Sequence, residues 1–141
     1  MRFIITARRD DNAEPNEAPF DEELFVRYMR FNEELQKAGV LVAAEGLLPD
    51  APGARVGVSG GKRKVLDGPF AESKELVGGF YIIDVPSLEE AKAWALRCPT
   101  GLGTDNTLEI RQLTGSSDIP KPLLDLASEV APTWTATLAK R

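Results

Sequence analysis

The sequence predicts an α+β fold whose main layer is an antiparallel sheet. Short apolar runs rich in β-branched residues alternate with two longer stretches in which apolar residues recur at helical spacing. The order along the chain is strand, helix, strand, hairpin, strand, helix, strand, so that two β-α-β units flank a hairpin. Units of this length favour a ferredoxin-like sheet with both helices on one face. The 141 residues are enough for one such domain.

The first β-α-β unit is predicted within residues 2–48. Residues 2–8 form an apolar run typical of a strand, and residues 40–48 form another. Between them, residues 20–39 predict a helix, with Asp21 as its N-terminal cap and Gly39 at its left-handed end. The apolar residues of this helix share one stripe and are Leu24, Tyr28, Phe31, Leu35 and Ala38.

The hairpin and the second unit follow. Residues 54–66 contain two short arms around Ser59-Gly60-Gly61, where glycine supplies the positive φ of a tight turn. Residues 76–85 and 107–113 predict strands. The helix between them starts at Ser87, which has capping-box spacing to Glu90, and ends before Pro99.

The strand predicted at 76–85 is apolar on both of its faces. Phe80 and Ile82 alternate with Tyr81 and Ile83, so neither face has the polar residues of a face that meets water. The two helices cover only one face. We therefore expect a second copy of the chain to cover the other, in a two-fold homodimer built sheet to sheet.

Composition excludes several classes of function. The chain has no histidine, which removes the commonest general base and zinc ligand. A net charge of −5 opposes direct nucleic-acid binding, and no apolar run reaches the roughly 20 residues of a membrane span. The single cysteine, Cys98, together with an N-terminal run too short for a signal peptide, indicates a cytoplasmic protein.

Two carboxylates are the candidate catalytic residues. Glu45 is the only charge in its predicted strand, and by alternation it shares a face with Leu41 and Ala43. Burial between two copies would favour a protonated carboxyl group, which suits acid–base chemistry near neutral pH. With Asp67 beside it, the pair would share one proton and transfer it to a small substrate.

Four further residues are candidates for substrate binding. Arg111, on a strand expected to be central, would bind an anionic group, and Tyr81 would offer a hydroxyl. Glu72 and Lys74 lie at the entrance of the strand after the turn. Oxygen-only metal binding near Asp67 lacks the spacing of a calcium loop, so we expect neither metal nor cofactor.

A simpler alternative exists for each candidate. Asp67, followed by glycine and proline, is ordinary turn chemistry. Glu45 would pair with Arg111 or Lys74, and the Tyr81 ring would pack in the core. Residues 72–75 would form a solvated connection between strands.

The chain resembles the YCII-related family, and within it the DGPF-domain branch. The residues that carry the resemblance are the tetrapeptide at 67–70 within VLDGPFAESKELVGGFYIIDV (65–85), with AGVLVAAEGL (38–47), LEEA (88–91) and LEIRQL (108–113). It covers residues 1–113. The tail, 114–141, lies outside it and predicts a short helix between Pro122 and Pro132 that packs on its own domain or on the partner.

The resemblance implies a ferredoxin-like fold that dimerises through its sheets, and a function that is largely uncharacterised. An active-site pair proposed in the wider group includes a histidine, so it does not transfer to this chain. Some members occur beside or fused to alternative sigma factors. Two functions are therefore expected: an enzyme-like homodimer that binds a small molecule at the sheet-to-sheet junction, or a non-catalytic accessory module in sigma-factor-dependent transcription.

Overall fold

The main layer of the protein is a four-stranded antiparallel sheet. The computed structural model describes residues 1–8, 22–47, 53–68, 77–99 and 107–138. The sheet consists of β1 (Arg2–Arg8), β2 (Leu41–Gly46), β5 (Val77–Asp84) and β6 (Leu108–Gln112), in the spatial order β2-β5-β1-β6. Each β-α-β connection skips one strand of the other unit, so the two units interleave. This order confirms the predicted ferredoxin-like α+β fold.

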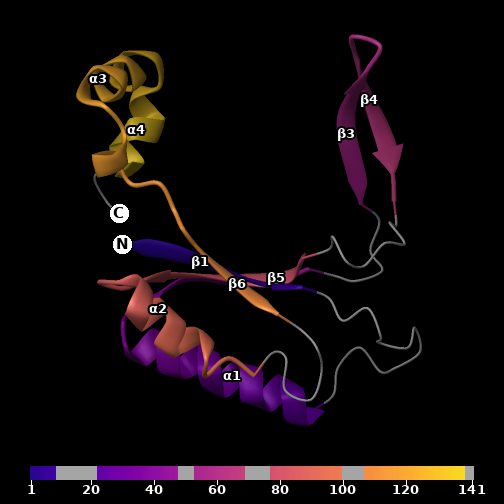
Figure 1. Ribbon diagram of the computed structural model, residues 1–141, viewed down its shortest axis with the longest axis vertical. Helices are drawn as coiled ribbons and strands as arrows, with labels where there is room; N and C mark the ends of the chain where they lie inside the picture. The colour runs from indigo at the N-terminus through magenta and orange to yellow at the C-terminus, as the bar shows by residue number, and fades with distance from the viewer. Residues whose placement is uncertain (9–21, 48–52, 69–76, 100–106, 139–141) are drawn as a thin grey trace.

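Two helices cover one face of this sheet (Figure 1). They are α1 (Glu22–Lys37) and α2 (Leu88–Ala95). The Ser87 hydroxyl accepts a hydrogen bond of 3.2 Å from the Glu90 amide, as the capping-box spacing predicts. Gly39 has a φ of 72° just after α1, which confirms the left-handed end of that helix.

The core lies between these helices and the sheet. Alternate residues of β1 and β5 point toward the helices and interlock with the apolar stripes of α1 and α2. The buried members of this core are Phe3, Ile5, Phe31, Leu35, Ile83, Val85, Ala91, Ala95 and Cys98. An ion pair between Arg97 and Glu34 joins the end of α2 to α1 at the surface.

The hairpin is a separate two-stranded sheet. It consists of β3 (Ala54–Ser59) and β4 (Lys62–Asp67), which pair with each other. Gly60 and Gly61 both have positive φ, which confirms the tight glycine turn that the sequence predicts. Every residue of the two strands is exposed.

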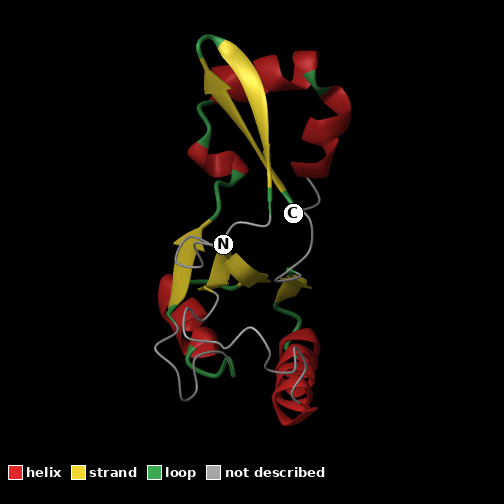
Figure 2. Cartoon of the chain, turned by 90° about the vertical axis from the view of Figure 1, so that its right-hand side faces the viewer, coloured by secondary structure: helices red, strands yellow, loops and turns green. Residues whose placement is uncertain are grey.

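The tail forms helices that stand apart from the core. After the short 3₁₀ helix η2 (Ser116–Asp118) come α3 (Lys121–Val130) and α4 (Pro132–Leu138), which pack against each other. Figures 1 and 2 show the tail helices and the hairpin on the same side of the sheet, opposite to α1 and α2. No helix among the described ranges is long and apolar enough to span a bilayer.

The pairing of β2 with β5 depends on a glycine. A Cβ atom added at Gly79 would lie 2.9 Å from the carbonyl oxygen of Glu45, whereas one added at the paired Gly46 would meet nothing within 4 Å. We expect Gly79→Ala to lower the free energy of unfolding by about 1–3 kcal/mol, because backbone must move to admit the methyl group. Urea denaturation measures this change.

Gly46→Ala is the matched control, since neither glycine has a positive φ. It should change the free energy of unfolding by less than about 1 kcal/mol, in the stabilising direction. Equal effects of the two substitutions would contradict the described pairing of β2 and β5.

Candidate functional site

The face of the sheet opposite the helices carries the candidate site residues of β2 and β6. We call it the open face. Its side chains lie in two rows across the four strands, because strand pairing aligns every second residue. The rows are Glu45, Phe80, Thr6 and Glu109, and Ala43, Ile82, Ile4 and Arg111.

The centre of the open face is apolar. Three apolar residues of the open face, Ile4, Phe80 and Ile82, are only partly buried. On the helix face of the same strands, Phe3, Ile5 and Ile83 are buried. The charged side chains lie on the outer strands. The open face therefore combines an apolar floor with charges at both edges, an arrangement that suits a ligand with an apolar body and polar ends.

Glu45 lies on the open face, exposed, at the β2 edge. The expected face-sharing with Leu41 is wrong, because the register of β2 shifts between Leu41 and Ala43. The extra residue at this bulge turns Leu41 to the helix face, where it packs on the core. Ala43 and Glu45 stay together on the open face.

Arg111 also lies on the open face, but not on a central strand. The expectation of a central position is wrong, because β6 pairs with β1 alone and forms the edge opposite β2. The interleaved topology places the first strand of each unit in the centre and the last strand at an edge. Arg111 Nε lies 4.0 Å from Glu109 Oε1 on the same strand, so Arg111 pairs with Glu109 and not with Glu45.

Tyr81 points to the other side of the sheet. Its hydroxyl donates a hydrogen bond of 2.8 Å to Asn32 Oδ1 on α1, and its ring packs edge-on against Phe31 at a centroid distance of 5.4 Å. The structure thus separates Tyr81 from Glu45 and Arg111. This placement fits the core-packing alternative for Tyr81.

Asp67 belongs to the hairpin and not to the main sheet. It is the last residue of β4 and lies opposite Ala54 of β3. Its side chain is exposed. Within the described residues, no hydrogen bond or ion pair joins Asp67 to Glu45. Glu72 and Lys74 lie outside the described residues.

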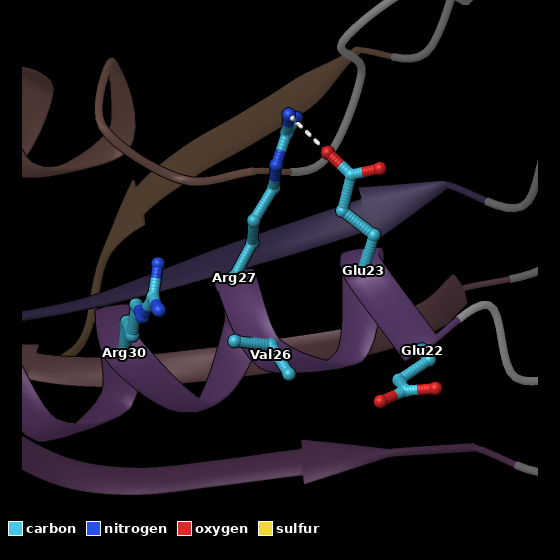
Figure 3. Close-up of a pocket in the computed structure, with 5 residues that line it drawn as sticks. All are labelled: Glu22, Glu23, Val26, Arg27 and Arg30. Carbon is cyan, nitrogen blue, oxygen red and sulfur yellow. Dashed lines mark hydrogen bonds and ion pairs between the residues drawn. The ribbon is translucent and has the colours of Figure 1, made fainter.

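A further recess lies on α1. It has a volume of about 620 Å³ and is lined by Glu22, Glu23, Val26, Arg27 and Arg30. Figure 3 shows the ion pair of 2.9 Å between Arg27 and Glu23. The recess is open and its residues come from one exposed helix surface, so we do not place the candidate site there. No group of three potential metal ligands occurs in the described part of the chain.

The comparisons with known proteins decide the family. The family model of the YCII-related domain matches residues 1–114. The chain belongs to the YCII-related domain family. A relative of this YCII-related chain, an uncharacterised protein of Rhizobium meliloti (strain 1021), is 39% identical over 77 residues, which are 55% of this chain and 62% of that protein. The chain thus matches less than two thirds of that relative's length.

A solved structure similar to this YCII-related chain is 5-chloro-2-hydroxyhydroquinone dehydrochlorinase from Burkholderia phenoliruptrix AC1100, in complex with 2,5-dihydroxybenzoquinone. The two chains are 19% identical, with a TM-score of 0.43 over 85% of this chain and 100% of that one. Within the YCII-related domain, the family match covers the open face and the hairpin and ends before the tail helices.

The two tyrosines of the YCII-related domain give a pH prediction. Burial raises the pKa of Tyr28 to about 12 and also raises the pKa of Tyr81, with a smaller contribution from Cys98 in each case. Because the folded state holds these protons more tightly than the unfolded state, their contribution to stability is complete below pH 10 and declines as the pH rises past 10.

Absorbance at 295 nm measures this ionisation directly. The folded protein should form tyrosinate only well above pH 10, and the chain in denaturant should do so near pH 10. Tyr28→Phe isolates the signal of Tyr81, since the chain has two tyrosines. Half-ionisation near pH 10 in the folded protein would contradict the described burial of both rings.

Proposed function

We propose that this chain binds a small molecule on the open face of its sheet, in a cavity that forms when two copies pair sheet to sheet. The observation that carries the proposal is the apolar floor of Ile4, Phe80 and Ile82, which α1 and α2 leave uncovered. A partly exposed apolar surface in the middle of a sheet favours a second layer. The open face of a second copy has the same apolar centre and could form that layer.

Pairing of two copies would also bring the charged residues of the two edge strands closer together. In one chain, Glu45 and Arg111 lie in different rows and on opposite edge strands, and the axes of these strands are about 14 Å apart across three strand spacings. A two-fold axis parallel to the strands brings the β2 edge of one copy over the β6 edge of the other. Because this axis keeps each row at the same place along the strands, Glu45 then lies above Glu109 of the partner subunit, and Arg111 of the partner subunit lies one row away, about 7 Å along the strand.

The proposed ligand is a small organic anion with an apolar or aromatic body. The Arg111 guanidinium binds its anionic group with parallel hydrogen bonds. Glu45, desolvated by the second layer, accepts or donates a proton. Asp67 is the proposed second carboxylate, with Glu72 and Lys74 as proposed binding residues near it. We leave Tyr81 out of the site because its hydroxyl is engaged by Asn32.

A regulatory role is the second candidate function. It is favoured by the exposed apolar side chains of the tail, such as Leu126 and Trp134, which a protein partner could cover. Such a partner would be linked to sigma-factor-dependent transcription. In that case the open face would bind no small molecule.

A thermal-shift screen with small aromatic and aliphatic acids tests the first function. We expect ligands to raise the melting temperature of the parent protein, and Glu45→Gln and Arg111→Gln to weaken binding about tenfold or more, since a charge-assisted hydrogen bond contributes about 1.5–3 kcal/mol. Asp67→Asn should weaken it as well.

Glu33→Gln is the matched control, because Glu33 is an exposed carboxylate on α1. It should bind as the parent does. Equal ligand shifts in the parent and in all three site variants would show that the site assignment is wrong.

A further inference from the structure

We propose that the β3–β4 hairpins of two copies pack face to face and in opposite directions, so that Arg63 of each copy pairs with Asp67 of the partner subunit. This inference rests on the pairing of two copies proposed above, but it is carried by the residues of the hairpin. It gives a second copy as the occupant of an apolar surface that lies outside the main sheet.

The two sides of the hairpin differ in character. Residues that pair across β3 and β4 share a side, and so do alternate residues of each strand. One side, which we call the valine side, consists of Ala54, Val56, Val58, Arg63, Val65 and Asp67. The other, which we call the basic side, consists of Arg55, Gly57, Ser59, Lys62, Lys64 and Leu66. Three of the four cations of β3 and β4 therefore lie on the basic side.

The centre of the valine side is apolar and uncovered. Val56, Val58 and Val65 are 65%, 73% and 64% exposed. The strands β3 and β4 pair only with each other, and a two-stranded hairpin is at best marginally stable unless another layer packs against it. A layer of protein over these valines would therefore stabilise the hairpin.

The strand registers place the two hairpins at the same end of a pair of copies. The hairpin follows β2 and precedes β5, and the end of β2 lies beside the start of β5, at Gly46 and Gly79. A two-fold axis parallel to the main strands keeps this end of one copy next to the same end of the other. Figure 1 shows the hairpin strands running across the main strands, so the same rotation reverses the direction of the hairpin. The two hairpins therefore lie near each other and point in opposite directions.

The charges of the valine side favour this antiparallel arrangement. Arg63 lies near the glycine turn and Asp67 at the base of the hairpin, about 13 Å apart along β4. No ion pair joins them within the described residues. When two valine sides pack in opposite directions, the turn of one hairpin lies over the base of the other. Arg63 then lies over Asp67 of the partner subunit, and the two-fold symmetry repeats this pair.

Other ways of packing two hairpins are less favourable. Parallel packing of the valine sides would place Arg63 over Arg63 of the partner subunit, and contact between two basic sides would oppose Arg55, Lys62 and Lys64. In the antiparallel arrangement the basic sides face outward. The ion pair also leaves one oxygen of Asp67 for the ligand proposed above, because a carboxylate has two oxygens.

Chemical crosslinking of the full chain tests the inference. In the antiparallel arrangement Val56 and Val65, the central pair of the valine side, lie next to the two-fold axis, and each lies over the same residue of the partner subunit. Packed sheets lie about 10 Å apart, so a short bismaleimide reagent joins two cysteines there. We expect Val65→Cys to give a crosslinked dimer as its main product. Val56→Cys repeats the test if the first variant folds poorly, which a thermal melt reveals.

Two controls define the background. Leu66→Cys is the matched control, because Leu66 is the next residue along β4 and is 61% exposed, but lies on the basic side. It should give severalfold less crosslinked dimer than Val65→Cys. The parent protein contains only the buried Cys98 and should not crosslink.

Charge reversal in the Val65→Cys background tests the proposed ion pairs. Arg63→Asp would oppose two carboxylates and Asp67→Arg would oppose two cations, so each should lower the yield of crosslinked dimer severalfold. The double variant Arg63→Asp/Asp67→Arg exchanges the two charges and should restore the yield.

Four results would overturn the inference. Equal yields from Val65→Cys and Leu66→Cys, or no crosslink in Val56→Cys and Val65→Cys when the protein has the mass of a dimer, would reject the hairpin contact and leave the sheet-to-sheet pairing intact. Failure of the double charge variant to restore the yield would reject the pair of Arg63 and Asp67. A single-chain mass at every concentration would reject both the hairpin contact and the proposed pairing of the sheets.

Discussion

The structure depends on one constraint: the centre of its sheet is apolar on both faces, and in the part of the chain that the structure describes, α1 and α2 cover only one of them. On the helix face, Phe3, Ile5 and Ile83 are buried against α1 and α2. On the open face, Ile4, Phe80 and Ile82 are partly exposed. Complete burial of such a side chain stabilises a protein by about 1.5–3 kcal/mol. Burial of these side chains under a second layer of protein would therefore stabilise the molecule.

The interleaved topology then determines where chemistry can occur. Because each β-α-β unit starts with a central strand and ends at an edge, the central strands supply apolar side chains and the edge strands supply Glu45 and Arg111. A single chain holds these two charges apart. A site that uses both charges would therefore need residues from two copies of the chain.

Most of the fold follows from local sequence signals. Residue periodicity, the Ser87 cap and the Gly60-Gly61 turn predict the elements, and the strand–helix order predicts the sheet. The site is harder to predict because it depends on register. Nothing local marks the bulge that moves Leu41 to the helix face, or the pairing that makes β6 an edge. Alternation alone also leaves open which face Tyr81 occupies, since both faces of β5 are apolar.

The central claim, that a second copy covers the open face, is tested most directly by sedimentation equilibrium of the unmodified protein over a range of concentrations. We expect the mass of two 15.4 kDa chains, and dissociation when Ile82→Asp introduces a charge at the centre of the open face. A single-chain mass at every concentration would show that no second copy covers the open face.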